Sequence, residues 1–105
     1  MGSLLYEGRS LEFDDRLLTH LHIVIVQKLR SSESFAMSWM NTLSTGDGRT
    51  SIWLDRTIPL LFNFAGSRPP TINRDWLTTL RTSADSSTGL LVTGEDGQLT
   101  RCGRK

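Results

Sequence analysis

The first third of the chain carries a strand pattern followed by a helix pattern. Apolar residues on both sides of Gly8 predict a short hairpin that ends near Phe13. Further on, apolar positions recur every three or four residues and predict a helix that runs to about Leu29. The face of this helix that would turn towards the core consists of Leu17, Leu18, Leu21, Val24, Ile25 and Lys28.

Two signals compete in the middle of this segment. The β-branched run Ile-Val-Ile-Val at 23–26 favours a strand. Asp14 is placed to cap a helix, and Phe13 and Leu18 have the spacing of a hydrophobic staple. Because the cap, the staple and the apolar spacing agree with one another, we favour the helix, in which His20 lies off the apolar face.

The central third of the chain has the pattern of three strands joined by short connections. Apolar and polar residues alternate in 35–40, in 49–55 and in 58–65, and the polar segment 41–48 separates the first two. These connections are too short for helical crossovers. The three strands are therefore expected to pair in succession as an antiparallel meander.

The last third predicts a second helix and a short strand. Residues 66–70 contain two prolines and break the sheet, after which Asn73 can cap a helix. The apolar stripe of this helix is Ile72, Trp76, Leu77, Leu80 and Ala84. A strand at 90–92 and a flexible tail at 95–105 complete the order ββ-α-βββ-α-β. This order predicts an α+β fold, a small two-layer sandwich with a mainly antiparallel sheet and two helices, in one domain of residues 1–94.

Length and composition fit one globular domain. Of the 105 residues, 37% are hydrophobic and 22% are charged, which is the balance of a folded protein rather than a disordered one. The longest apolar run has four residues, far below the roughly 20 that a membrane helix needs, and no secretory signal pattern is present. We therefore expect a cytoplasmic protein without membrane contact. Cys102 is the only cysteine, which excludes an intrachain disulfide and a thiolate metal cluster.

Basic residues concentrate in the middle of the chain. Residues 49–81 carry five arginines against two aspartates, a net charge of +3, whereas the whole chain carries +1. Arginine suits the planar recognition of anions, and an exposed tryptophan can stack on a nucleic-acid base. The candidate residues for nucleic-acid or partner binding are Arg49, Trp53, Arg56, Arg68 and Arg74. Trp53 can equally pack in the core, and the sequence leaves the burial of all three tryptophans open.

A glycine-containing loop is the candidate anion site. Gly46, Gly48 and Arg49 could surround a phosphate with backbone N–H groups and a cation. The spaced glycines and the Gly-Lys-Ser/Thr ending of a P-loop are absent, and a hairpin turn explains the same residues. No cofactor is expected from this pattern.

Two pairs of titratable residues also have structural explanations. On a helix, His20 and His22 point to nearly opposite faces and cannot share one metal, although on a strand they would share a face. We interpret both as surface or helix-edge residues, and no metal site is expected. Asp14 and Asp15 are interpreted as a helix cap and a first-turn carboxylate rather than as a catalytic pair, because adjacent residues at a helix start diverge.

Several segments resemble one protein family. They are LEFDDR at 11–16, KLR at 28–30, ESF at 33–35, GRTSIWL at 48–54, IPL at 58–60 and GSRPPTINRDW at 66–76. Over roughly residues 3–93 the chain is similar to a family of actinobacterial proteins of about this length, commonly labelled ATP-dependent DNA ligases. The resemblance implies a lineage and a label, and it assigns no catalytic residue.

The chemistry of a ligase is missing from these residues. ATP-dependent ligases resemble nucleotidyltransferases, whose nucleophilic lysine lies in a Lys-x-Asp-Gly motif. Here Lys28 is followed by Leu-Arg-Ser, and Lys105 ends the sequence. We therefore expect no enzyme but a binding module whose partner is an unidentified protein or a second copy of the chain. The alternatives are a DNA-associated accessory module that uses the arginines of 49–81 and a domain that binds a small molecule or nucleotide.

Overall fold

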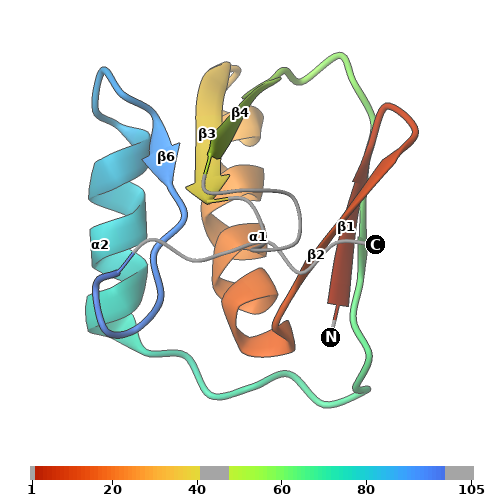
Figure 1. The fold of residues 1–105 in the computed structure, drawn as a ribbon, viewed down its shortest axis with the longest axis vertical. Helices are drawn as coiled ribbons and strands as arrows, with labels where there is room; N and C mark the ends of the chain where they lie inside the picture. The colour runs from red at the N-terminus through yellow and green to blue at the C-terminus, as the bar shows by residue number, and fades with distance from the viewer. Residues whose placement is uncertain (1, 41–47, 99–105) are drawn as a thin grey trace.

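Strands and helices follow one another along the chain in the order that the sequence predicts (Figure 1). The computed structural model describes residues 2–40 and 48–98. Within these two segments the elements are β1 (Gly2–Tyr6), β2 (Arg9–Phe13), α1 (Asp15–Arg30), β3 (Phe35–Met40), β4 (Arg49–Leu54), β5 (Leu60–Asn63), α2 (Arg74–Ala84) and β6 (Leu90–Leu91). The predicted α+β class and element order are therefore confirmed.

The strands form two three-stranded sheets. One sheet has the order β2-β1-β5 and is antiparallel throughout. The other has the order β4-β3-β6, in which β3 and β4 are antiparallel and the short β6 runs parallel to β3. Parallel pairing of β6 with β3 is possible because α2 lies in the long crossover that precedes β6.

The prediction that the three central strands pair in succession holds for β3 and β4 and is wrong for β5. β5 pairs with β1 and not with β4, which precedes it in sequence. Phe62 therefore lies opposite Leu4, and Leu60 lies opposite Tyr6. A turn closed by the Ile58 N–H and the Asp55 carbonyl, 3.1 Å apart, redirects the chain after β4. The short connection therefore carries the chain from one sheet to the other instead of closing a hairpin.

The segment 22–26 is helical, so the strand alternative is wrong. Each residue of the predicted apolar face of α1 is buried, Lys28 included. Both predicted caps are confirmed, because the Asp14 carboxylate accepts the Arg16 N–H and the Asn73 amide oxygen accepts the Trp76 N–H. The interpretation of His20 as a surface residue is wrong. His20 is 0% exposed because the chain that leads into α2 covers that side of the helix.

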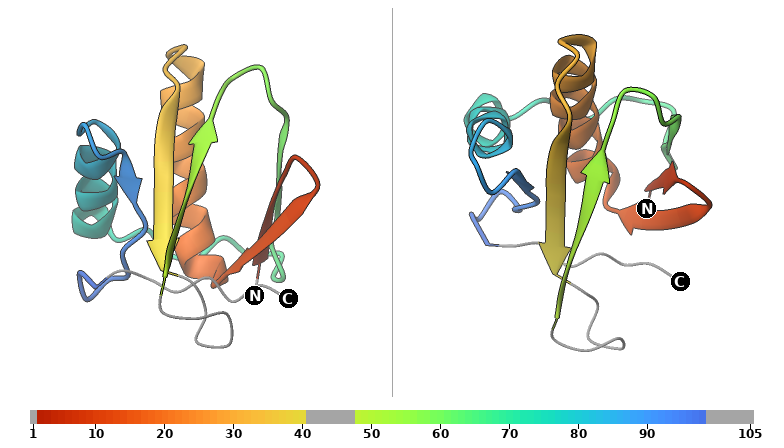
Figure 2. Two further views of the ribbon diagram at one scale, coloured as in Figure 1. Left: turned by 45° about the horizontal axis from the view of Figure 1, so that its top comes forward. Right: turned by 90° about the horizontal axis from the view of Figure 1, so that it is seen from above.

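The helices and sheets enclose one core. Figure 2 shows α1 behind β3, with α2 on one side of it and β1 and β2 on the other. Two of the three tryptophans belong to this core. Trp39 is 2% exposed and packs edge-on against Phe13, with ring centroids 6.1 Å apart, and Trp76 is 7% exposed. Trp53 is 59% exposed, which makes it the exception among the aromatic side chains of α2, β3 and β4.

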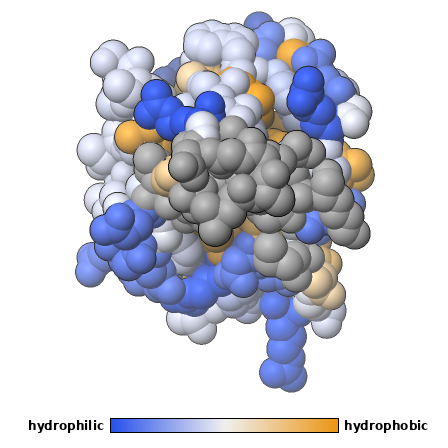
Figure 3. All heavy atoms as spheres, viewed as in Figure 1, coloured by the Kyte–Doolittle hydropathy of each residue, from blue (hydrophilic) through white to orange (hydrophobic). Residues whose placement is uncertain are grey.

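Hydrophobic side chains on the outside form small patches. In the face drawn in Figure 3, hydrophilic and intermediate residues make up most of the described surface, and hydrophobic residues show as separate spots. The large apolar side chains that remain exposed in the described part of the chain are Trp53, Leu61 and Phe64. These three side chains are therefore candidates for contact with another molecule.

Candidate functional site

The residues predicted to bind a partner lie on several elements. Arg49 and Trp53 share one face of β4, because residues 49, 51 and 53 are the exposed positions of that strand. Arg56 follows β4 and donates a hydrogen bond to the Ser32 hydroxyl at 3.3 Å. Arg68 lies in the segment between β5 and α2, and Arg74 is the first residue of α2. The strand thus brings Arg49 and Trp53 together, while the other arginines belong to separate parts of the surface.

The predicted anion loop lies partly outside the described residues. Gly46 falls in the segment 41–47, which the structure leaves undescribed, whereas Gly48 and Arg49 are exposed at the start of β4. The phosphate-binding hypothesis for this loop therefore stays a prediction.

Trp53 stands beside a shallow hollow at the tip of the β1–β2 hairpin. The hollow has a volume of about 340 Å³ and is lined by Tyr6, Glu7, Arg9, Ile52, Trp53 and Ile58. The Tyr6 hydroxyl donates a hydrogen bond to the backbone carbonyl of Trp53. This contact ties the end of β4 to the hairpin, so the backbone of Trp53 is held while its indole ring remains open to solvent.

A second hollow continues the first along the same hairpin. It has a volume of about 570 Å³ and shares Tyr6, Glu7 and Ile58 with its neighbour. On its far side Leu61 is 53% exposed. Together Tyr6, Trp53, Ile58 and Leu61 form what we call the hairpin-tip surface.

The electrostatics of the hairpin-tip surface are mixed. Burial, together with the nearby carboxylates of Glu7 and Asp55, raises the pKa of the Tyr6 hydroxyl above its ordinary value. The hydroxyl therefore stays protonated at neutral pH and can donate its hydrogen bond. Because its tyrosine is neutral and its other members are apolar, the hairpin-tip surface suits recognition by contact better than proton transfer.

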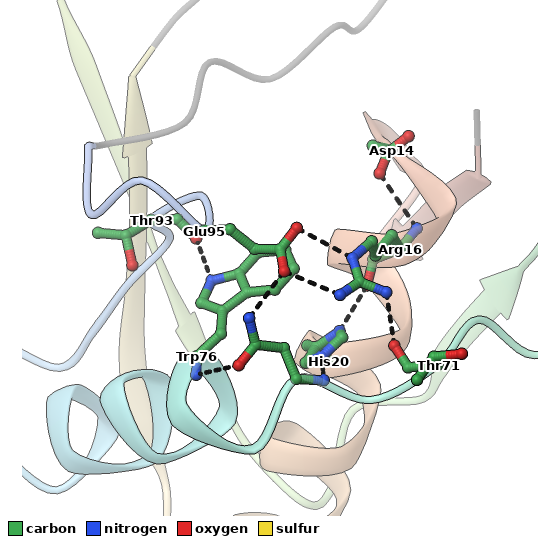
Figure 4. Close-up of polar contacts among 8 residues, drawn as sticks. Asp14, Arg16, His20, Thr71, Trp76, Thr93 and Glu95 are labelled. Carbon is green, nitrogen blue, oxygen red and sulfur yellow. Dashed lines mark hydrogen bonds and ion pairs between the residues drawn. The ribbon is translucent and has the colours of Figure 1, made fainter.

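The opposite end of the molecule holds a dense polar network, drawn in Figure 4. The Arg16 guanidinium binds both carboxylate oxygens of Glu95, with Nε 3.0 Å from Oε1 and Nη2 2.8 Å from Oε2. It also donates to the Thr71 carbonyl. The Asn73 amide nitrogen donates to the same Glu95 carboxylate at 2.8 Å. The network thus ties the start of α1 to the start of α2 and to the segment after β6.

His20 and Trp76 form the buried part of this network. His20 Nε2 accepts the Asn73 backbone N–H at 2.9 Å, and Nδ1 lies 2.7 Å from the Arg16 carbonyl, so the hydrogen bonds select the neutral Nδ1–H tautomer. The imidazole stacks on the Trp76 indole with ring centroids 4.4 Å apart. The indole N–H donates to the Thr93 carbonyl at 2.8 Å. We call Arg16, His20, Asn73, Trp76 and Glu95 the helix clasp.

The helix clasp has the properties of a structural element. The Arg16 hydrogen bonds, followed by that from Asn73, lower the pKa of Glu95 to about 2. Each of its polar groups described above has a hydrogen-bond partner within the fold, as expected of a structural network. The sequence gives no local signal for it, because residues 16 and 95 are 79 positions apart.

The helix clasp extends beyond the predicted domain boundary at residue 94. Glu95, the first residue of the predicted tail, is held by Arg16 and Asn73. Residues 99–105 are outside the described part of the chain, so flexibility of the tail stays a prediction.

Lys28 ties the other ends of the two helices together. Its ammonium group lies 2.7 Å from carboxylate oxygens of both Asp85 and Glu33. These hydrogen bonds, with Asp85 contributing most, raise the pKa of Lys28 above its ordinary value. This lysine is therefore a charged structural residue, a role that also explains its place on the apolar face of α1.

Two further features, a metal-binding cluster and a membrane-spanning helix, are absent from residues 2–40 and 48–98. Among residues 2–40 and 48–98, no three or more His, Cys, Asp or Glu side chains gather where they could hold a metal ion. No helix in this described part is long and apolar enough to cross a membrane.

The fold and its surfaces define a small α+β domain with two tightly tied helices and one exposed tryptophan. The chain belongs to a family described as a domain of unknown function, DUF7882, whose model matches residues 1–95. Comparison with curated proteins finds no match, and comparison with solved structures finds none either. Neither the ligase label nor an actinobacterial origin follows from the family match.

Proposed function

We propose that this chain is a small binding domain without catalytic activity that recognises a partner protein through the hairpin-tip surface. The observation that carries the proposal is the 59% exposure of Trp53 on a backbone held by Tyr6. Tryptophan is the residue type most enriched among interface residues that dominate binding energy. Covering the exposed part of its ring contributes on the order of 2–4 kcal/mol to association.

The arrangement suits a partner because the site is held in place before binding. The Tyr6 hydrogen bond fixes the end of β4, so ordering that backbone costs little when a partner arrives. Ile58 and Leu61 extend the apolar contact on the other side of the hairpin tip. A central aromatic anchor with apolar neighbours and a charged rim is the usual anatomy of a protein interface.

The charges near Trp53 favour a protein over a nucleic acid. Glu7 and Arg9 line the hollow, and the Asp55 carboxylate lies close enough to Tyr6 to raise its pKa. Nucleic acids bind mainly through phosphate neutralisation, which requires a surplus of cations at the contact. Arg49, on the same face of β4 as Trp53, supports the DNA-associated alternative, but the carboxylates at the other end of the strand oppose it.

The proposal is tested by capturing partners from the lysate of the organism that makes the protein. Tagged wild-type chain is compared with Trp53→Ala and with Phe64→Ala, a matched control that removes an exposed aromatic ring elsewhere. Partners that Trp53→Ala loses and Phe64→Ala retains are then purified. In calorimetric titration with the purified partner, Trp53→Ala is expected to weaken binding by about tenfold or more.

Nuclease and salt separate the alternatives. If treatment with nuclease abolishes capture, and binding falls steeply from low to physiological salt, the DNA-associated alternative replaces the protein interface. If the captured protein is the chain itself, sedimentation equilibrium will show a dimer that Trp53→Ala dissociates, and the partner is a second copy. If no partner depends on Trp53, the proposed interface is wrong.

A further inference from the structure

A separate hollow lies beside α1, on the segment that connects β5 to α2. Its volume is about 250 Å³, and its walls include Phe64, Pro69 and Pro70 from the connecting segment and His22 from α1. An apolar cavity of about 150 Å³ holds a benzene molecule, so this hollow has room for one six-membered ring and a short arm. It shares no residue with the hairpin-tip surface or with the helix clasp.

The apolar side of the hollow is held in place by aromatic contacts. The His22 ring stands edge-on to Phe62, with centroids 4.6 Å apart and planes at 81°. It stands edge-on to Phe64 as well, at 6.0 Å and 89°. Phe64 is 38% exposed, so its ring offers an open face to an incoming molecule. The two prolines complete a rigid apolar wall, because their rings fix the backbone of 69–70.

The Asp15 carboxylate, the negative group in the lining of the hollow, is hydrogen-bonded to the backbone. The Asp15 carboxylate accepts the backbone N–H groups of Gly66 at 2.9 Å and Ala65 at 3.1 Å. These hydrogen bonds, that of Gly66 first, lower the pKa of Asp15. The same bonds hold the backbone at 65–66 against the start of α1, so the rim of the hollow is fixed before any ligand binds.

The positive group in the lining, Arg68, lacks a comparable partner in the described part of the chain. Arg68 lies on the rim, is exposed, and has no hydrogen bond or ion pair to the residues described at 2–40 and 48–98. Arg16, by contrast, has its guanidinium occupied by Glu95. An unpaired guanidinium next to a rigid apolar wall is complementary to a molecule with a carboxylate at one end and a ring at the other.

We propose that this hollow binds a small aromatic carboxylate, with the ring against Phe64 and His22 and the carboxylate on Arg68. The guanidinium presents two parallel N–H donors to the two carboxylate oxygens, which fixes the orientation of the ligand. Stacking or edge contact with the aromatic wall covers the ring. The sequence named Arg68 as a candidate binding residue, but it did not indicate that Phe64, His22 and the two prolines join it in one hollow.

Three probes that share a benzyl group and carry an anionic, a neutral or a cationic end group test the proposal. The full-length, ¹⁵N-labelled chain is titrated with phenylacetate, with neutral phenylacetamide and with cationic phenethylamine, and amide shifts are followed by NMR. For a ligand of this size we expect phenylacetate to saturate the amides of 64–68 with a Kd on the order of 1 mM. Phenylacetamide should bind several-fold more weakly, and phenethylamine should cause no saturable shift.

Matched variants assign the binding to named side chains. Arg68→Gln removes a guanidinium that has no hydrogen bond or ion pair in the described chain, so the variant should fold normally, and it is expected to weaken phenylacetate binding by about tenfold or more. Phe64→Ala should weaken it as well, and Trp53→Ala should bind like the wild type. Equal affinity of Arg68→Gln and wild type, equal binding of phenethylamine, or the lack of any saturable shift by phenylacetate would each overturn the proposal. None of these results depends on the partner proposed for the hairpin-tip surface.

Discussion

Trp76 and Trp53 have opposite surroundings, although the sequence leaves the burial of both side chains open. The Trp76 ring is 7% exposed, its N–H is bonded to the Thr93 carbonyl, and His20 stacks on its face. The Trp53 ring is 59% exposed, and its hydrogen bond from Tyr6 uses the backbone carbonyl instead of the indole. The comparison indicates that one indole stabilises the fold and that the other is free to contact a second molecule.

The helix clasp and the hairpin tip also differ in whether their charged side chains form ion pairs. In the helix clasp, Arg16 and Glu95 form a two-point ion pair with a further donor from Asn73. Around the hairpin tip, Glu7 and Arg9 line the hollow, and no ion pair joins them in the described part of the chain. Completed hydrogen bonds hold a structure together, whereas charges left on a rim can set the orientation of a partner.

The largest expected effect comes from removing the buried indole. Trp76→Ala leaves a cavity beside Leu80 and deprives both His20 and Thr93 of contacts, so we expect the free energy of unfolding to fall by about 3–5 kcal/mol. Urea denaturation followed by circular dichroism measures the loss. A decrease below about 1 kcal/mol would show that Trp76 does not anchor the helix clasp.

The next largest effect on stability is expected from a variant that removes the hydrogen bonds of His20 but keeps an aromatic ring. His20→Phe keeps an aromatic ring on Trp76 but leaves the Asn73 N–H and the Arg16 carbonyl without this buried partner. Such losses cost about 1–3 kcal/mol of unfolding free energy. His22→Phe serves as the control, because the described structure gives His22 ring contacts with Phe62 and Phe64 and no hydrogen bond. Equal stability of the two variants in urea denaturation would contradict a stabilising role for the His20 hydrogen bonds.

These predictions rest on features that the sequence indicated to different degrees. The apolar face of α1 and both helix caps could be predicted, because they depend on residues within a few positions of one another. The burial of His20 could not be predicted, because it depends on Asn73, 53 residues away. Helical periodicity identifies an apolar face, but it does not indicate what covers the remaining faces.

Sheet pairing shows the same limit. Alternation identified the strands, yet β5 pairs with β1 across more than fifty residues, and no local pattern in 58–65 distinguishes that partner from β4. The candidate site was likewise predicted in part. The sequence identified Trp53 and Arg68 as candidate binding residues, but the hollows beside them join segments that are distant in sequence.

The ion pair between Arg16 and Glu95 in the helix clasp is expected to have a smaller effect on stability, and this effect depends on pH. The folded pKa of Glu95 is about 2 against an ordinary value of 4.5, so between these pH values the unfolded chain binds more protons at this residue than the folded chain. Glu95 therefore stabilises the fold above about pH 4.5, and this contribution is lost as the pH falls towards 2.

Glu95→Gln should remove this part of the pH dependence. Thermal unfolding between pH 7 and pH 2 is expected to show a shallower decline in Tm for Glu95→Gln than for the wild type, with the two curves converging at low pH. Asp15 and Asp55 also have lowered pKa values, so a residual acid dependence will remain. Asp96→Asn, whose carboxylate accepts only the nearby Gln98 N–H in the described structure, is the control and should follow the wild-type curve. Parallel curves for Glu95→Gln and wild type would contradict the role of the ion pair.

The smallest expected effect on stability belongs to Trp53. Trp53→Ala removes a ring that is more than half exposed, while the hydrogen bond from the Tyr6 hydroxyl to the backbone carbonyl can still form. We expect the free energy of unfolding to change by no more than about 0.5 kcal/mol, against the several-fold larger loss for Trp76→Ala. Trp53→Phe should match the wild type in stability and retain part of the partner affinity, because it keeps an aromatic ring at the same place. If Trp53→Ala instead destabilises the chain as strongly as Trp76→Ala, its ring is part of the core, and the contrast on which the proposed interface rests disappears.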